Sequence, residues 1–379
     1  MESPLLRVAS GHLSLFLVFY ISGQVMGMAV LGEQLLGVDY ALLSLVSMAA
    51  VLLYVLFGGM DASVRTDYFQ GVMMSVIAVV VFGAVVLEFG GGLLESQQRI
   101  VSSLHSVSPG LAGTFHPGSM MFGGPVNVLA ISWLLFAFIL MPHLMNRLLA
   151  LESEEDLRGF LMGAGLSLFT MSVFMVWAGL AGRVLFPGLP APDYVVPRFL
   201  EYAFPAWISM VLSLGILSAI LSTADSILQS VSAIIGYDIY LFGYRSMYRG
   251  DVETADIRNG ELSGSVERRT RLVTRLGMVA VAAVSVAIAF LRPEGILVLT
   301  QMGITGLLSG IAIPVIASYL RPDFSSRTYE VGFFSGVTTY LVLFAGGLME
   351  NFFLVFLVAG AANLAAVSFH HLVWERVYP

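Results

Sequence analysis

The sequence predicts an all-α polytopic membrane protein with about ten transmembrane helices. First, 58% of its 379 residues are hydrophobic and only 11% are charged, with a mean hydropathy of +0.88. A soluble domain carries about 25% charged residues, so lipid must be part of the solvent of this chain. Second, its apolar runs are about twice as long as β-barrel strands and do not alternate. These observations exclude a soluble enzyme, a nucleic-acid-binding protein and a disordered scaffold.

Ten apolar segments are long enough to cross a bilayer, which takes about 20 residues. Turn residues or charges, such as Gly58-Gly59 before Asp61, separate them. The first segment is too long for a cleaved signal peptide, and no small-residue cleavage site follows it. The predicted spans are 12–36, 40–59, 67–89, 126–146, 159–186, 206–241, 272–291, 295–320, 330–348 and 351–374.

Two connecting segments differ from the spans. Residues 90–125 are rich in Gly, Ser, Pro and His, which predicts a long extramembrane loop. Residues 243–271 hold six arginines and five acidic residues, so they form a polar segment on one side of the membrane. This segment is too small for a catalytic domain.

The segment 206–241 would reach about 54 Å as one helix, whereas the hydrocarbon core is ~30 Å thick. It is either one long helix or a tight hairpin. A single crossing places fourteen of the 18 arginines on the N-terminal side of the membrane. Because cytoplasmic loops carry the excess of basic residues, a single crossing is favoured. We therefore predict a multi-pass protein of the plasma membrane with both termini in the cytoplasm.

The same segment carries a polar stripe. At 100° per residue, Asp225, Ser226 and Gln229 lie within about 60° of Ser222. A carboxylate in the middle of a membrane helix costs ~2.5–3.5 kcal/mol, so it must face protein, water or an ion. One interpretation is a pathway for a small cation such as Na⁺, because such cations prefer hydroxyl, carbonyl and carboxylate oxygens. The other is a seam between packed helices, where Ser and Thr are common.

Three segments together resemble the sodium/solute symporter family, whose members carry proline, sugars, pantothenate, monocarboxylates and similar solutes. Residues 53–71 are similar to a pattern of this family. The pattern is an apolar run followed by Gly-Gly, a short turn and then Thr-Asp-x-x-Gln. Residues 141–147 are similar to the Pro-His-x-x-x-Arg pattern. Residues 217–226 and then 237–240 resemble a helix with Ala-x-x-Ser-Thr-x-x-Ser that ends in Asp-x-Tyr. The match covers essentially the whole chain in the family's order.

The resemblance implies an inverted-repeat, LeuT-like transporter fold with two five-helix halves. It implies Na⁺ as the coupling ion, no other cofactor and a small organic solute as substrate. It places Na⁺ on the polar stripe, at Ala219, Ser222 and Thr223. The ion pathway would continue through Asp67, Asp225, Ser226 and Gln229. The fourth span would face the solute through Trp133, Phe136 and Phe138. Taken by themselves, these aromatic residues favour packing between helices over a solute site.

One departure from the family concerns the number of spans. Members have about thirteen, and the three that are absent here precede the first segment. We therefore expect a single transmembrane domain, 1–379, in which 12–89 is the remainder of the first repeat and 126–320 is the second repeat. Residues 330–374 would form two accessory helices. The absent helices leave three alternatives: a truncated chain, helices supplied by a separate polypeptide, or loss of transport.

The predicted function is secondary active transport that couples the inward Na⁺ gradient to solute uptake by alternating access. The alternative is a transport-inactive fragment, a membrane sensor or a partner subunit of a symporter. An enzyme is not expected, since the sequence shows no metal-ligand spacing and no nucleophile–base pair, and it contains no Cys. The expected partners are Na⁺, the solute and the lipid bilayer, and no nucleic acid.

Overall fold

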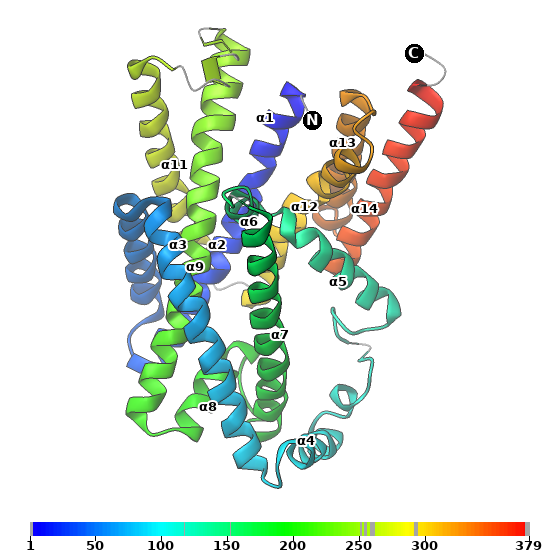
Figure 1. The fold of residues 1–379 in the computed structure, drawn as a ribbon. Coiled ribbons are helices and arrows are strands. Elements are labelled where there is room, and N and C mark those ends of the chain that lie inside the picture. Colours follow the sequence, from blue (N-terminus) through cyan, green and yellow to red (C-terminus); the bar gives the residue numbers. More distant parts are fainter. Residues whose placement is uncertain are drawn as a thin grey trace.

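The computed structural model describes residues 3–116, 118–151, 153–250, 252–253, 256–257, 262–291 and 295–375. Within these ranges the chain is helical and contains no strand, so the predicted all-α class is confirmed. Figure 1 shows the long helices running roughly side by side. The start of α1 and the end of α14 lie at the same end of the bundle, which we call the terminal end.

The first half of the chain forms long helices joined by short 3₁₀ segments. Asp39 caps the N-terminus of α3 because its carboxylate accepts hydrogen bonds from the amides of Ala41 and Leu42. Gly37, with φ +62°, ends the preceding helix. The elements are α1 (Pro4–Leu13), η1 (Ser14–Phe16), α2 (Leu17–Leu36), α3 (Tyr40–Phe89), α4 (Leu93–Val107), η2 (Pro109–Ala112), α5 (Pro125–Ala137), η3 (Phe138–Leu140), α6 (Pro142–Leu148) and α7 (Glu154–Leu185).

The second half continues in the same way. Asp193 accepts a hydrogen bond from the amide of Ile296 at 3.3 Å and so holds the start of α12. The elements are η4 (Pro192–Tyr194), α8 (Val195–Ala203), α9 (Ala206–Ile234), η5 (Ile235–Arg249), α11 (Gly264–Phe290), α12 (Ile296–Leu320), α13 (Ser326–Ala345), α14 (Phe352–Phe369) and η6 (His370–Glu375).

Eight helical stretches among the described residues are long and apolar enough to cross a membrane. A ninth is formed by α5 to α6, which bends by 53° next to Met141. The remaining predicted span, 330–348, is also a helix, α13, but it is not among these nine because charged residues near its start, Arg327 and Glu330, make it less apolar. The first span is longer than predicted, because the helix already begins at Pro4.

The element α3 contains two spans that run in opposite directions (Figure 1). In a straight helix, residues 54 and 66 would be about 18 Å apart, yet the hydroxyls of Tyr54 and Thr66 are hydrogen-bonded. The chain therefore folds back between 57 and 65 while helical hydrogen bonding continues. This agrees with the predicted separation of the second and third spans.

The helix α9 continues without interruption through η5, a π-helical segment, to give one stretch of 44 residues. The single crossing predicted for 206–241 is therefore confirmed, and the hairpin is not formed. The helical stretch is longer than predicted because it includes residues up to Arg249, which were assigned to the polar segment.

The prediction that residues 90–125 form only a loop was wrong. Residues 93–107 form α4, whose buried side is made of Ser96, Ile100 and Leu104. These residues are four apart, so they lie on one face and pack onto α3 and α7. The Gly and Pro residues on both sides of α4 indicated a loop, and the short apolar pattern was too weak a signal to predict a helix.

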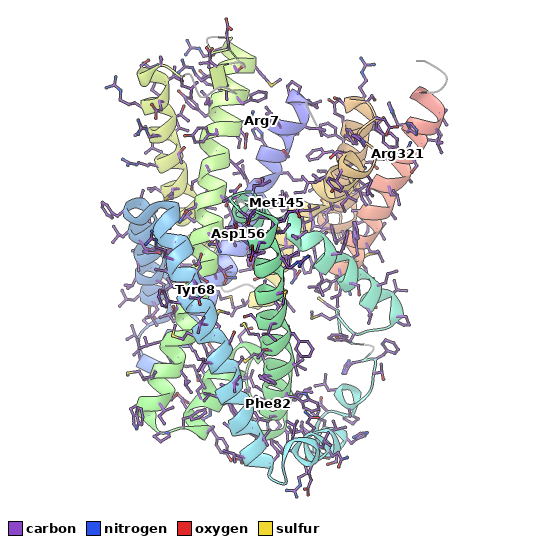
Figure 2. All side chains as sticks on the ribbon, viewed as in Figure 1. Arg7, Tyr68, Phe82, Met145, Asp156 and Arg321 are labelled. Carbon is purple, nitrogen blue, oxygen red and sulfur yellow. The ribbon has the colours of Figure 1, made fainter. Side chains whose placement is uncertain are left out.

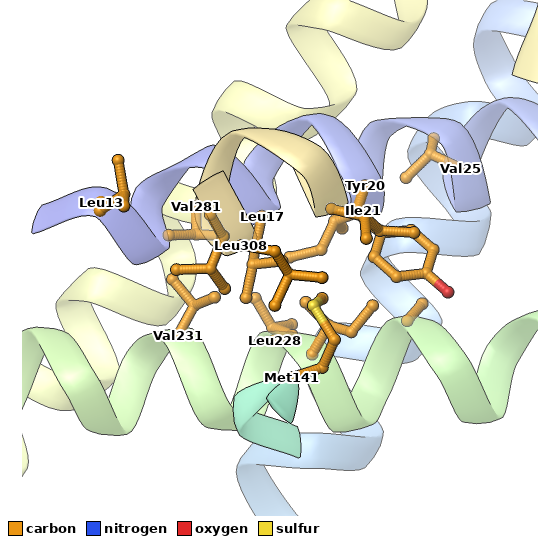
Figure 3. Close-up of a cluster of buried hydrophobic side chains, with 14 of the residues drawn as sticks. Leu13, Leu17, Tyr20, Ile21, Val25, Met141, Leu228, Val231, Val281 and Leu308 are labelled. Atoms are coloured by element: carbon orange, nitrogen blue, oxygen red, sulfur yellow. The ribbon is translucent and has the colours of Figure 1, made fainter. Parts of the chain in front are cut away.

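The largest buried cluster lies around α2, as Figure 3 shows. Leu17 and Ile21 of α2 meet Leu228 of α9 and Leu308 of α12 there, and all four are fully buried. The outer sides of the bundle are apolar as well. Figure 2 shows Tyr68 on the outside of α3, where it is 70% exposed. Such exposed apolar surface is expected of helices that face lipid.

Candidate ion-binding site

The polar stripe predicted on α9 faces the interior of the protein. Asp225 is 2% exposed, and Ser226 and Ala219 are also buried. On this side α9 packs against α2, α3, α6 and α11. The stripe is therefore surrounded by protein on several sides, which a carboxylate at this depth requires.

The three residues predicted to bind sodium converge on one carbonyl oxygen. The hydroxyl of Ser222 donates to the carbonyl of Ala219 at 2.7 Å, and the hydroxyl of Thr223 lies 3.5 Å from the same oxygen. Hydroxyls often donate to the carbonyl three or four residues earlier, so this geometry also occurs without an ion. It does bring three oxygen atoms together within one turn of α9.

A cavity of about 280 Å³ lies beside this turn. Ala219 and Thr223 form part of its wall, and Gln24 of α2 supplies a further polar side chain. Most of the remaining wall is apolar, with Met74 of α3 and Met171 of α7 among its residues. Thr223 therefore lines a partly open cavity between α2, α3, α7 and α9.

Asp225 lies one turn further along α9 and is held by two hydroxyls. Ser63 of α3 donates to Oδ2 at 3.1 Å, and Ser226 donates to Oδ1 at 2.9 Å. Ser226 also lies 2.6 Å from the carbonyl oxygen of Ser222. This hydroxyl therefore connects the Asp225 carboxylate with the turn that carries the predicted sodium ligands.

Arg147 of α6 joins this group to α3. Its Nη2 contacts both Oδ2 of Asp67 and the hydroxyl of Ser226. Ser63 lies 3.4 Å from the same oxygen of Asp67, so Asp67 and Asp225 share one hydroxyl neighbour. We call Ser63, Asp67, Arg147, Asp225 and Ser226 the inner polar cluster.

The inner polar cluster contains two carboxylates and one guanidinium. Oδ1 of Asp67 is buried and accepts no hydrogen bond from the described part of the protein. The same holds for Oε1 of Gln70, while Nε2 of Gln229 is a buried donor without an acceptor there. Buried polar atoms normally have partners, so these atoms remain available to bind a ligand.

The structure places the three predicted solute-facing residues elsewhere. Trp133 stacks on Phe356 of α14, with ring centroids 5.9 Å apart, and on its neighbour Phe136. Phe138 packs edge to face with His143. None of the three lines the cavity beside Thr223. Their role toward the solute stays a prediction.

The sequence assigned Asp67, Asp225 and Ser226 to one ion pathway, and the structure places them in one cluster, but two members of that cluster were omitted. The role of these three residues in ion passage stays a prediction. Arg147 was part of a quoted motif, and its charge at the end of an apolar run could have singled it out. Ser63 lies in a segment interpreted only as a turn, and no local signal marks it. Gln229 lies on the same helix face as expected, but its amide nitrogen has no partner among the described residues.

Several known proteins are similar to this chain. A model of the sodium:solute symporter family matches residues 2–339. The sodium/pantothenate symporter of Haemophilus influenzae is 30% identical over 235 residues, which is 60% of this chain and 46% of that protein. The high-affinity proline transporter PutP of Bacillus subtilis is 26% identical over 97% of this chain and 73% of that protein.

A solved structure has the same fold. It shows the substrate-bound outward-open state of a Na⁺-coupled sialic acid symporter, with a TM-score of 0.70 and 19% sequence identity. The similarity covers 97% of this chain and 75% of that chain, which supports the LeuT-like class expected from the sequence. The comparisons lend no support to a separate polypeptide that supplies further helices. Since the family model matches most of its length, the chain belongs to the sodium:solute symporter family.

Proposed function

We propose that this chain is a Na⁺-coupled secondary transporter of a small organic solute. The observation that carries the proposal is the convergence of Ser222 and Thr223 on the carbonyl of Ala219, next to a partly open cavity. Membership of a family of sodium symporters supports the choice of Na⁺ as the coupling ion. Na⁺ is a hard cation, and these three oxygens are the kind of ligand it prefers.

The inner polar cluster would form the route by which Na⁺ leaves. Its two carboxylates and one guanidinium carry one negative charge in excess, which attracts a cation to the turn next to Ser222. Asp225, Ser226 and Gln229 would line the first part of this route on α9. Asp67 would lie beyond them, where its contact with Arg147 must break before an ion can pass.

The proposed solute is a small organic carboxylate. Relatives of this chain are named as transporters of proline and of pantothenate, and the solved structure with the same fold is described as a sialic acid symporter. All three compounds carry a carboxylate at neutral pH. Trp133, Phe136 and Phe138 remain the proposed solute-facing residues of the fourth span.

The proposed orientation places the terminal end of the bundle in the cytoplasm. Arg7 and Arg321 both lie at this end, as Figure 2 shows. Basic residues are enriched on the cytoplasmic side of membrane proteins, so their position favours cytoplasmic termini. The protein would then be a multi-pass component of the plasma membrane.

Binding of Na⁺ to the purified protein is the most direct test. The protein in detergent is titrated with NaCl against choline chloride at constant ionic strength, and bound ²²Na⁺ is counted. We expect saturable binding that falls by at least about tenfold in affinity in the Ser222→Ala, Thr223→Ala double variant. Uptake of labelled proline and pantothenate into reconstituted vesicles then identifies the solute.

The control variant is Ser132→Ala, Thr170→Ala. Both hydroxyls donate at 2.8 Å to a carbonyl four residues earlier, as hydroxyls in membrane helices commonly do, but they lie on exposed faces of α5 and α7. This variant should bind Na⁺ as the wild type does. Equal Na⁺ binding by the wild type and the Ser222→Ala, Thr223→Ala variant would remove the proposed site.

A further inference from the structure

The N-terminal part of α11 carries a row of arginines on its outer side. Arg268, Arg271 and Arg275 are three or four residues apart, so they lie on one face of the helix. A cleft of about 410 Å³ is lined by these three residues and Leu272. We call these four residues the arginine row.

The three arginines and Leu272 are all exposed at the N-terminal part of α11. Thr270 and Val281 lie on another face of the helix and are buried, and α11 packs against α2, α3, α9 and η5. Below the row, the outer face continues with Leu276 and Val279, which are 59% and 45% exposed. Leu272, Leu276 and Val279 are four and then three residues apart, so an exposed apolar strip begins at the arginine row and continues along α11.

The charge of the row is only partly balanced by the protein. Arg271 pairs with Glu267 at 3.2 Å, and Nε of Arg268 donates to the carbonyl of Gly264 at 3.1 Å. Arg275 has no acidic partner within the part of the chain that the structure describes. Three guanidiniums and one carboxylate thus leave two positive charges on this surface.

The length of α11 places these charges at the level of lipid phosphates. The apolar stretch 276–291 spans about 24 Å, which is roughly 6 Å less than the ~30 Å hydrocarbon core. A short apolar stretch is accommodated when long flanking side chains extend toward the interface. Arg275 and Arg271 must therefore extend toward the headgroup layer, in the direction of Arg268.

We propose that the arginine row binds the headgroup of an anionic phospholipid in the leaflet at the terminal end. The guanidiniums hold the phosphate groups through charge-assisted, bidentate hydrogen bonds, which Arg forms well. The acyl chains lie along Leu276 and Val279. The excess of two positive charges matches cardiolipin, which carries two phosphates, better than phosphatidylglycerol, which carries one. This site is separate from the proposed ion site and does not depend on transport.

Lipid binding by the purified, delipidated full chain tests the proposal. Native mass spectrometry measures the affinity for cardiolipin, phosphatidylglycerol and phosphatidylcholine, each added at the same phosphorus concentration. We expect cardiolipin to bind most tightly and phosphatidylcholine at least about tenfold more weakly. In the Arg268→Gln, Arg271→Gln, Arg275→Gln variant, cardiolipin binding should weaken by at least about tenfold, since each arginine near an anionic surface contributes about a fivefold factor.

Two variants separate a local site from general effects. Arg99→Gln, Arg183→Gln, Arg198→Gln removes the same charge elsewhere and should leave cardiolipin binding unchanged. The Lys triple variant at 268, 271 and 275 keeps the charge but loses the bidentate hydrogen bonds, so its affinity for cardiolipin should lie between those of the wild type and the Gln triple variant. If the Gln triple variant does not fold, Arg275→Gln alone should weaken binding about fivefold.

Three outcomes would overturn the proposal. The first is cardiolipin affinity that is unchanged in the Gln variants. The second is phosphatidylcholine binding that is as tight as cardiolipin binding. The third is displacement of cardiolipin by an equal concentration of inorganic phosphate, which would show a site for a soluble anion in place of a lipid.

Discussion

Arg147 and Asp67 are eighty residues apart in the sequence, but Nη2 of the arginine contacts Oδ2 of the aspartate. Their side chains are 28% and 13% exposed, so this pair lies between a surface ion pair and a buried one. It connects α6 to α3 next to the polar face of α9. The free energy of this ion pair therefore affects how α3, α6 and α9 move relative to one another.

We predict a coupling free energy of about 1–2 kcal/mol between Arg147 and Asp67, between the values typical of exposed and buried pairs. The measurement is a double-mutant cycle with Arg147→Gln, Asp67→Asn and the double variant. The free energy of unfolding in mixed micelles is determined for each protein.

The exposed pair of Arg99 and Glu95 serves as the control for this cycle. Both side chains are 52% exposed, and the pair spans one helical turn. Its coupling should be only about 0.3–0.5 kcal/mol. Equal coupling in the two pairs would mean that the contact between α6 and α3 contributes no more than a surface pair.

Replacement of Asp225 should have the opposite effect to replacement of Asp67. Asp225 accepts hydrogen bonds from Ser63 and Ser226 but makes no ion pair among the described residues. Asp225→Asn removes a buried charge and keeps a hydrogen-bonding amide, so we expect a gain of about 1 kcal/mol in stability without Na⁺. Asp67→Asn should instead destabilise, because it leaves Arg147 without its carboxylate.

Thermal unfolding in choline chloride checks this difference in sign. The same variants measured in NaCl should show that Na⁺ stabilises Asp225→Asn less than the wild type, because stabilisation by a bound ligand increases with the affinity of the folded protein for it. If both Asp225→Asn and Asp67→Asn lose stability, Asp225 does not carry the unpaired negative charge of the inner polar cluster.

Gly336 marks a close approach between α13 and α12. A Cβ at this position would lie 2.1 Å from the carbonyl oxygen of Ser309 and 2.7 Å from the Asn363 amide nitrogen. Small residues allow membrane helices to pack this closely. We expect Gly336→Ala to destabilise the protein by about 1–3 kcal/mol, since the helices must separate.

The matched control for Gly336 is Gly163 of α7, where a Cβ would meet nothing within 4 Å. Gly163→Ala should stabilise by about 0.5–1 kcal/mol because alanine favours the helix. The free energy of unfolding in mixed micelles is compared for both variants. Similar effects at the two positions would show that α12 and α13 are less closely packed than the structure indicates.

Tyr202 of α8 donates a hydrogen bond of 2.6 Å to Glu88 at the end of α3. This hydrogen bond and the charge of the carboxylate raise the pKa of Tyr202. Glu88→Gln should therefore lower the pKa of Tyr202 toward about 10, its usual value. Absorbance of the phenolate is titrated, and the Tyr202→Phe spectrum is subtracted to isolate this residue.

Glu95→Gln is the control for the titration, since Glu95 pairs with Arg99. It should leave the Tyr202 titration unchanged. A Tyr202 pKa that is the same with and without the Glu88 carboxylate would show that the α8–α3 contact is not formed in solution.

The spans could be predicted because a membrane helix is specified by a local property, the length of an apolar run. The reversal in α3 was marked by Gly58-Gly59 and Asp61, and the single crossing of α9 followed from the distribution of arginines. The helix α4 was missed because its buried side contains only three residues, and glycines and prolines flank it.

The candidate site was harder to predict from the sequence than the spans were. The stripe on α9 follows from helical periodicity, so Ser222, Asp225 and Ser226 could be placed on one face. The contact of Arg147 with Asp67 depends on how α6 lies against α3, which no local pattern specifies. For the same reason the sequence could not identify Phe356 of α14 as the ring on which Trp133 stacks.

The uninterrupted helix formed by α9 and η5 has a mechanical consequence. The proposed sodium ligands and Tyr248, which is 82% exposed, belong to the same continuous helical stretch. If the helix tilts at the level of Ser222, its end outside the bilayer moves through a larger distance than the residues near Ser222. A spectroscopic probe at residue 248 could thus report ion occupancy from the aqueous phase, without disturbing the residues that hold the ion.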